Sequence, residues 1–466
     1  CVKSGGPIVA KSNDPTRMHE FDAAVTELIF DYMRERLALK ETPIDFPGDG
    51  KALETALSGL INPDGNQIEE VLNLYDETIS RAVISADTPR FFAFIPAAPT
   101  KAALLFDMIV SAASLQGISW LEASGAVAAE NQVLRWMADA AGMPASAGGT
   151  FVSGGSAANL AALTVARDIG REKLNSPMPR PPVRIAMSKQ AHSSIGNSLS
   201  ILDIEPLIVD TKTDRFTGED LTKALAQVGP NDSPVVGVVG TAGTTNAGIV
   251  DDLAGIGRVA KENNLWFHVD AAYGSAALLA PSINKEFAGI ELADSITMDP
   301  HKWWFAPFDV AAIIYRNPAL AKKVHTQDAS YLDVLHTEEE VWNPTDYAYH
   351  LTRRARGLPL WFSVVVNGTD AYRDAVEASL TLTREVTELI RNNPDLELVI
   401  EPTLSVILWR RKGWTPSDYN KLQDRLLEKQ IAFVTPTTWH GETVGRFAFL
   451  HPNTTVHMVK EVLAQL

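Results

Sequence analysis

Between about residue 91 and residue 365, short β-branched runs alternate with helical runs, and this alternation constrains the fold more than any other feature. The runs that we expect to form strands are residues 183–187, 207–209, 235–239, 265–269, 295–298 and 311–315. Helical patterns lie between several of them, as at residues 221–228 and 253–263. Strands that alternate with helices predict a mostly parallel sheet covered by helices on both faces.

The segment before this region is expected to be a helical arm. Residues 1–90 show apolar residues at helical spacing over 21–39 and 68–83, and they contain no expected strand. A helical segment without a sheet of its own has to bury its apolar face elsewhere. We therefore expect the arm to pack on another domain or on a second subunit.

The segment after this region predicts a small α+β domain over residues 366–466. A long helical pattern covers residues 372–391, and a closing one covers 456–466. The stretches expected as strands are residues 396–400, 405–410, 431–435 and 445–450. The chain is thus divided into an arm (1–90), a large α/β domain (91–365) and a small domain (366–466).

Composition excludes several classes of function. The formal net charge is 41 − 57 = −16, which argues against nucleic-acid binding and against anionic membrane surfaces, because both need a basic face. The single cysteine, Cys1, rules out an internal disulfide and a cysteine-rich zinc site, and we expect no metal ion. Residues 102–120 are apolar but interrupted by polar side chains, so we expect a buried helical region rather than a membrane span. These features predict a soluble cytoplasmic protein.

Ligands in open α/β sheets bind at the carboxyl ends of the strands. Four candidate sites for chemistry are found by looking for reactive side chains there. Ser153-Gly154-Gly155-Ser156 opens an apolar helical pattern, where small residues let backbone amides approach an anion, although the same sequence suits an ordinary tight turn. His192 and Asp270 each follow an expected strand, and each also has an ordinary structural interpretation. Lys302 lies beside a histidine and two tryptophans, where desolvation would free its amine to act as a nucleophile.

Together the four sites describe a binding site for pyridoxal 5′-phosphate. In such a site the phosphate rests on backbone amides, a lysine forms a Schiff base, a carboxylate holds the pyridinium nitrogen and a histidine stacks on the ring. Lys302, Asp270 and His192 supply those three side chains in this sequence.

The sequence closely resembles the group II pyridoxal-phosphate decarboxylases, the family of aromatic-L-amino-acid decarboxylase and glutamate decarboxylase. The most specific matching segment is Asp299-Pro300-His301-Lys302-Trp303. The other matching stretches are residues 89–94, 153–163, 190–194, 243–245, 268–273, 294–309, 353–361 and 446–448. The resemblance implies a fold-type-I enzyme with a seven-stranded, mostly parallel sheet, and an obligate homodimer with active sites at the subunit interface.

The resemblance also implies roles for individual residues toward the cofactor. Lys302 would form the Schiff base, His192 would stack on the ring, and Asp270 would pair with the ring nitrogen. The remaining residues expected to contact the cofactor are Gly155, Ser156 and His301 at the phosphate, and Thr245 and Ala272 around the ring.

The resemblance also predicts a substrate pocket. The resemblance places Phe94, Ile95 and Pro96 in it, and Arg446 would either meet a substrate carboxylate or form a structural ion pair. An apolar pocket for an aromatic substrate is suggested by Phe94, by Trp120 and by the pair at 303–304, although such aromatics also build cores.

The family associates a tyrosine on a mobile loop with the return of a proton to the substrate. Tyr347 in the segment 327–352 resembles that tyrosine, and Tyr349 is a second candidate. Either tyrosine could instead be part of loop packing.

The resemblance implies decarboxylation of an L-amino acid, with an aromatic substrate favoured, to the amine and carbon dioxide through an external aldimine and a quinonoid. The nearest alternative is oxidative deamination coupled to decarboxylation, which yields an aldehyde. Two others are a different fold-type-I activity and a cofactor-binding protein that has lost turnover and acts as an assembly partner.

Overall fold

The structure is a computed structural model that describes the 466-residue chain apart from residues 1–15, 96–97, 175–180, 328–329 and 331–340. Its larger sheet has the strand order β1-β7-β6-β5-β4-β2-β3, in which only β7 runs antiparallel to its neighbours. The strands are β1 (Gly148–Val152), β2 (Arg184–Ser188), β3 (Glu205–Val209), β4 (Val235–Thr241), β5 (Trp266–Asp270), β6 (Ser295–Met298) and β7 (Ala311–Tyr315). The expected mostly parallel sheet is therefore confirmed, and β6 and β7 have the bounds that the sequence predicts.

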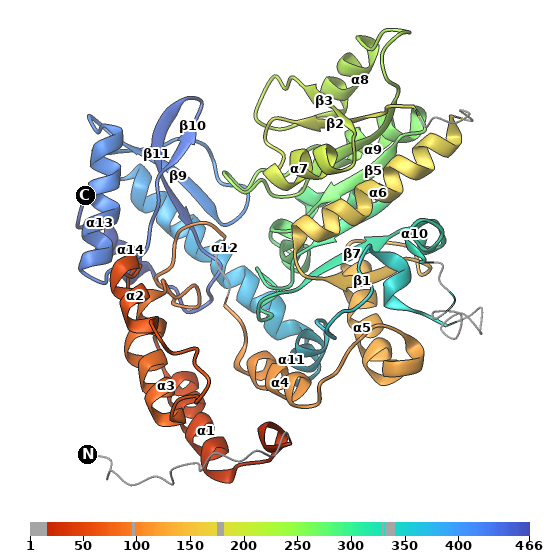
Figure 1. The fold of residues 1–466 in the computed structure, drawn as a ribbon. Coiled ribbons are helices and arrows are strands. Elements are labelled where there is room, and N and C mark those ends of the chain that lie inside the picture. Colours follow the sequence, from red (N-terminus) through yellow and green to blue (C-terminus); the bar gives the residue numbers. More distant parts are fainter. Residues whose placement is uncertain (1–15, 96–97, 175–180, 328–329, 331–340) are drawn as a thin grey trace.

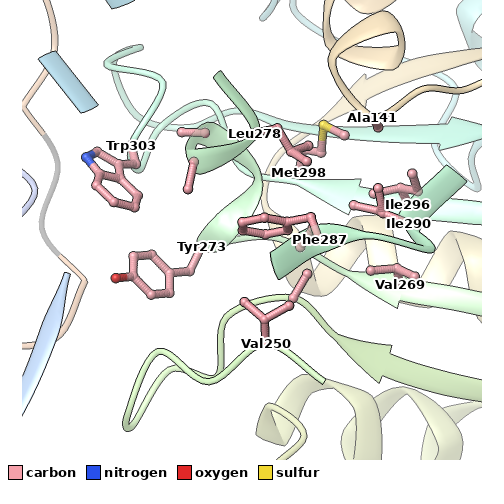
Figure 2. Packing of buried hydrophobic residues seen from close by; sticks show 14 of the residues in the cluster. Ala141, Val250, Val269, Tyr273, Leu278, Phe287, Ile290, Ile296, Met298 and Trp303 are labelled. Carbon is pink, nitrogen blue, oxygen red and sulfur yellow. The ribbon is translucent and has the colours of Figure 1, made fainter. Parts of the chain in front are cut away.

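Helices cover both faces of this sheet (Figure 1). They are α4 (Lys101–Ala112), α5 (Trp120–Ala140), α6 (Gly155–Lys173), α7 (Ser193–Ile201), α8 (Gly218–Ala226), α9 (Leu253–Glu262), α10 (Pro318–His325) and α11 (Leu358–Asn367). Successive strand residues enter different hydrophobic clusters: on β7, Ile314 joins one and Ile313 and Tyr315 join the other. Figure 2 shows part of the first cluster, where Val269, Ile296 and Met298 of neighbouring strands pack together with Phe287. This two-sided burial explains why the strands are apolar throughout.

Strand β1 was not expected from the sequence, because it begins with two glycines. Both glycines are required by close packing. A Cβ on Gly149 would lie 1.8 Å from the carbonyl oxygen of Ile313, and one on Gly148 would lie 2.7 Å from the ring of Trp342. The weak strand propensity of glycine is thus overridden by contacts with residues distant in sequence.

A second, antiparallel sheet has the order β10-β11-β9-β8. Its strands are β8 (Leu396–Leu398), β9 (Val406–Arg411), β10 (Thr437–Trp439) and β11 (Glu442–Ala448). The helices of this region are α12 (Thr369–Arg391), α13 (Pro416–Glu428) and α14 (Val456–Leu463). Figure 1 shows α12 running from this sheet toward the large one.

The strand expected at residues 431–435 is wrong, because this stretch hydrogen-bonds outside the sheet. Phe92 N donates to the Phe433 carbonyl at 2.8 Å, and Phe433 N donates to the Arg90 carbonyl at 2.9 Å. The pairing is an isolated parallel bridge between Phe91 and Phe433, and the strand of the sheet begins only at Thr437.

The N-terminal helices α1 (Ala23–Ala38), α2 (Gly50–Leu57) and α3 (Ile68–Leu74) contain no buried residue among those described. They extend away from both sheets (Figure 1). The region 102–120 is helical over α4, as expected. The expectation that it is buried is wrong for the single chain, because Leu105 and Ile109 are about half exposed. Within the described part of the chain, no helix combines the length and apolarity that crossing a bilayer would demand.

A buried ion pair fixes α5 against the chain segment that precedes α11. Arg353 donates two hydrogen bonds of 2.8 Å to the Glu130 carboxylate, and both side chains are at most 3% exposed. Glu130 also accepts the Gly357 amide at 2.8 Å, and Arg353 donates to the Gly117 carbonyl. Removing one charge of such a pair leaves the other buried without its partner.

We therefore expect Glu130→Gln to lower the free energy of unfolding by about 3–5 kcal/mol. Urea titration followed by tryptophan fluorescence measures this change. The matched control is Lys189→Met, which removes an ion pair with Asp210 whose side chains are at least 73% exposed, and it should leave the titration unchanged. Equal effects of the two substitutions would contradict the importance given to burial.

Candidate active site

The residues that the sequence predicts around the cofactor meet in a cavity of about 230 Å³ at the carboxyl ends of β4, β5 and β6. Its lining consists of Gly154, Gly155, Ser156, Asn159, His192, Ser194, Thr241, Gly243, Thr245, Asp270, Ala272, Tyr273, Asp299, His301 and Lys302. All eight residues expected around the cofactor are in this lining. Carboxyl ends of neighbouring parallel strands meet at one edge of a sheet, so residues far apart in sequence converge there.

The start of α6 forms one wall of the cavity. The amides of Ala157 and Ala158 donate to the Gly154 carbonyl, whereas those of Gly155 and Ser156 have no hydrogen-bond partner in the described structure. Free amides at the start of a 19-residue helix attract an anion. A Cβ on Gly155 would lie 2.8 Å from Asp299 Oδ2, so only glycine lets the helix approach this closely.

Asp270 ends β5 and is 5% exposed. Its Oδ1 accepts the Ala272 amide at 3.1 Å, and its Oδ2 accepts the Asn159 side-chain amide at 3.0 Å. These two bonds fix the orientation of the carboxylate in the cavity wall. Its remaining lone pairs can accept a hydrogen bond from a cationic ring nitrogen.

Behind Asp270 lies a chain of buried hydrogen bonds. Burial lowers the pKa of His268 to about 4, so its imidazole is neutral at neutral pH and donates from one nitrogen. Because the Asn159 carbonyl oxygen can only accept, His268 Nε2 carries the proton, and Nδ1 accepts from the Ser295 hydroxyl at 2.9 Å, while the Trp266 indole donates to Ser295 Oγ at 2.9 Å. His268 Nε2 then donates to the Asn159 carbonyl oxygen at 3.0 Å. All donors point the same way, and the chain ends on the Asp270 carboxylate.

Lys302 lies in a turn after β6 that the Lys302 amide closes by donating to the Asp299 carbonyl at 3.0 Å. Its ammonium is 2.8 Å from Asp299 Oδ2, and its side chain is 22% exposed. The amine therefore lies inside the cavity but can still be reached from solution.

Two histidines complete the cavity. His192 caps the start of α7 and is exposed, and its Nδ1 is held by Ser194 through Oγ at 2.8 Å and the amide at 3.2 Å. His301 Nδ1 accepts the Val310 amide at 3.0 Å, which leaves the proton on Nε2. Burial lowers the pKa of His301, so this ring is a neutral donor.

These groups fit pyridoxal 5′-phosphate. Free amides and the His301 donor suit its phosphate, the Asp270 carboxylate suits a protonated ring nitrogen, and the Lys302 amine suits its aldehyde. An exposed imidazole, that of His192, suits a ring face. Thr241 Oγ1 and Asp299 Oδ1 are buried lining atoms that lack a hydrogen-bond partner among the described residues, and such atoms are expected where a polar ligand binds.

Arg446, on β11, lies beside this cavity but outside its lining. It is 5% exposed, and its guanidinium donates to the carbonyls of Thr245 at 2.7 Å and Asn246 at 3.1 Å. Burial lowers its pKa to about 10, so it stays cationic at neutral pH. Two of its donor groups thus already hold the loop that carries Thr245.

The expected substrate-pocket residues are not in the cavity lining either. Phe94 is 60% exposed, with its ring 6.1 Å from that of Phe433, and Ile95 packs on the large core. Pro96 lies outside the described residues. Trp303 and Trp304 are at most 1% exposed, and Trp303 stacks on Tyr273, so the suggestion that this pair lines a substrate pocket is wrong for this chain.

The two candidate loop tyrosines have different environments. Tyr347 is 4% exposed and stacks on Trp342 at 4.1 Å, and burial raises the pKa of its hydroxyl. Tyr349 is 52% exposed. The structure brings neither tyrosine into the cavity lining.

Sequence reasoning missed Asn159, Ser194 and Asp299 as site residues. Asn159 lies one helical turn after Gly155, on the face of α6 that meets the sheet, and this position could have marked it. Asp299 lies in the most specific motif of the chain and could have been found there.

Comparison with known proteins gives consistent results. The family model described as the pyridoxal-dependent decarboxylase conserved domain matches residues 52–412. An aromatic-L-amino-acid decarboxylase of Bacillus atrophaeus is 29% identical over 96% of this chain and 94% of its own length. A phenylacetaldehyde synthase of Arabidopsis thaliana is 26% identical over 99% and 97%. The fold matches the crystal structure of Oryza sativa TDC with PLP and tryptamine, with a TM-score of 0.87, 22% identity and coverage of 97% of each chain. The chain therefore belongs to the pyridoxal-dependent decarboxylase family and is a pyridoxal-phosphate-dependent carboxy-lyase.

Proposed function

We propose that this enzyme decarboxylates an aromatic L-amino acid to its amine, with Lys302 as the residue that bonds to the cofactor. The observation that carries the proposal is the convergence of Lys302, Asp270 and His192 on one cavity at the start of α6. The aromatic substrate is supported by the aromatic-L-amino-acid decarboxylase that is 29% identical to this chain.

The phosphate would be held at the start of α6, where the hydrogen-bond donors of the cavity gather. The amides of Gly155 and Ser156, the Ser156 hydroxyl and His301 Nε2 are its donors. These groups would anchor the cofactor and leave Lys302 to reach its aldehyde.

Asp270 would hold the proton of the ring nitrogen. When bound, pyridoxal phosphate supplies an aldehyde for an amine and a ring that accepts the electron pair left behind when carbon dioxide departs. A carboxylate that already accepts from Ala272 and Asn159 cannot turn away, so the ring proton stays where that electron pair needs it. His192 would cover the ring face, since Ser194 holds its Nδ1 and fixes the imidazole plane.

The proton that must return to the substrate carbon needs a donor that can reach the cavity. We assign this role to Tyr349 rather than Tyr347, because the Tyr347 ring is packed against Trp342 whereas Tyr349 is 52% exposed. The aldehyde-forming alternative stays open, since a phenylacetaldehyde synthase is among the relatives.

The proposal includes a homodimer. Exposed apolar side chains gather on α4 and α11, which pack together through stacked Phe106 and Phe362 rings at 4.3 Å. These side chains are Leu105, Ile109, Val365 and Val366, between 48% and 61% exposed. Apolar surface of this kind on neighbouring helices is typical of a subunit interface. The helices α1, α2 and α3 of the arm, which contain no buried residue among those described, would also gain a partner in a dimer.

The test of the function is a substrate panel on the holoenzyme, with carbon dioxide, amine and hydrogen peroxide followed together. We expect equal amounts of carbon dioxide and amine from tryptophan, tyrosine or phenylalanine, and Lys302→Ala should abolish both turnover and the near-visible absorbance of the bound cofactor. Abundant peroxide with little amine would favour the aldehyde product. Turnover of acidic or diamino substrates alone would overturn the aromatic assignment, and absorbance retained in Lys302→Ala would overturn the role of the lysine.

The two tyrosines form a matched pair of variants, since each loses one hydroxyl on replacement by phenylalanine. Tyr349→Phe should reduce amine formation by about 100-fold, the scale of a lost proton-transfer group, and should raise the share of aldehyde and peroxide. Tyr347→Phe should keep the wild-type products, because no hydrogen bond of its hydroxyl occurs among the described residues. A product switch in Tyr347→Phe instead would return the role to that residue.

The dimer is tested by mass in solution. Light scattering should give about twice the chain mass of 50.6 kDa for the wild type and a smaller mass for Ile109→Glu, which places a charge in the proposed interface. Ile208→Glu is the control, because Ile208 is also an exposed isoleucine but lies on β3, an edge strand of the large sheet, and not on α4 or α11. A monomeric wild type, or dissociation caused equally by both substitutions, would refute the proposed interface.

A further inference from the structure

Asp299 is a buried carboxylate to which neither the fold nor the cofactor assigns a role. Its side chain is 2% exposed, and Oδ2 lies 2.8 Å from Lys302 Nζ. Oδ1 has no hydrogen-bond partner within the described part of the chain. The turn that joins the Lys302 amide to the Asp299 carbonyl keeps both side chains on the same side of the loop.

The charges that face Asp299 identify its partner. His301 Nε2 is 3.6 Å from Oδ2, but burial lowers the pKa of His301, so that ring contributes a dipole rather than a charge. Gly155, on the start of α6, carries no side chain, and the other titratable groups of the lining are Asp270, His192 and Tyr273, none of which is a lysine or arginine. Lys302 is thus the cation that compensates the Asp299 carboxylate, and a buried carboxylate is costly without one.

This pairing competes with the bond that Lys302 is proposed to make. To bond to an aldehyde, the ammonium must lose one proton, its nitrogen must add to the carbonyl carbon, and water must leave as the C=N bond forms. The loss of that proton removes the positive charge and ends the ion pair with Asp299. Conversely, when a substrate amine replaces Lys302 on that carbon, the substrate ammonium gives up a proton and the departing lysine takes one up, and Asp299 stabilises the ammonium so formed.

We propose that Asp299 is a positioning residue that holds Lys302 as an ammonium whenever the lysine is not bonded to the cofactor. It therefore slows capture of the aldehyde by the empty protein and favours release of the lysine to an incoming amino acid. This inference rests on the proposed role of Lys302 and adds to it the group that receives the lysine.

The experiment measures capture of an aldehyde by the apoprotein, with absorbance recorded after rapid mixing over a range of pH. Pyridoxal is the main probe because it lacks phosphate, so it reports the amine alone. At neutral pH Asp299→Asn should capture pyridoxal about tenfold faster, because the carboxylate that pairs with the Lys302 nitrogen at 2.8 Å is gone.

Three further variants separate this role from a structural one. Asp299→Glu keeps the carboxylate and should retain slow capture. Asp309 lies on the same loop as Asp299, and its half-exposed carboxylate is paired with Arg356, so Asp309→Asn should match the wild type. Asp299→Ser removes the same charge and decides the question if Asp299→Asn does not fold, as judged by circular dichroism.

Two outcomes would overturn the proposal. Equal capture rates in the wild type and Asp299→Asn would show that the carboxylate does not hold the amine. Acceleration with pyridoxal 5′-phosphate but not with pyridoxal would show that Asp299 acts by repelling phosphate. Borohydride reduction and peptide mass spectrometry locate the captured aldehyde, and a label absent from Lys302 in every variant would instead refute the proposed function.

Discussion

Charged groups buried at one sheet edge are the constraint on which the rest of the site depends. Asp270, Asp299 and Lys302 share a cavity of about 230 Å³, and the two aspartates are at most 5% exposed. Such groups are stable only when each is paired or hydrogen-bonded. Asp299 is paired with Lys302, whereas Asp270 accepts from Ala272 and Asn159. One acid is therefore committed to the lysine, and the other keeps lone pairs for a cationic ligand.

The fold meets this constraint by supporting the loops from behind. The chain of donors from Trp266 to Asn159 lies beneath Asp270, inside the sheet and α6. On the other side of the loops, Tyr273 stacks on Trp303 at 5.6 Å and its hydroxyl lies 2.6 Å from Ser405 Oγ. Figure 2 shows these two rings side by side at the edge of the core. The loop that carries Lys302 is thus held by core aromatics rather than left to solvent.

Much of this arrangement could be predicted from the sequence. The alternation of strands and helices gave the sheet, and the positions of His192, Asp270 and Lys302 at its edge followed from the rule that ligands bind at carboxyl ends. Strand β1 was missed because local propensity does not register that Gly149 faces the Ile313 carbonyl at a distance too short for a Cβ. The sequence suggests Trp303 and Trp304 for the pocket because it does not show which side chains cover them. Their burial depends on contacts with residues distant in the chain, such as the stacking of Trp303 on Tyr273, which lies 30 residues earlier (303 − 273). The exposed faces of α4 and α11 show the same limit, since a sequence does not reveal whether a neighbour covers an apolar helix.

A crystal structure with pyridoxal 5′-phosphate tests the central claim most directly. The account predicts electron density continuous from Lys302 Nζ to the cofactor, the ring nitrogen at hydrogen-bond distance from Asp270, and the phosphate at the amides of Gly155 and Ser156. A cofactor bonded to another lysine, or bound with its phosphate toward Asp270, would contradict it.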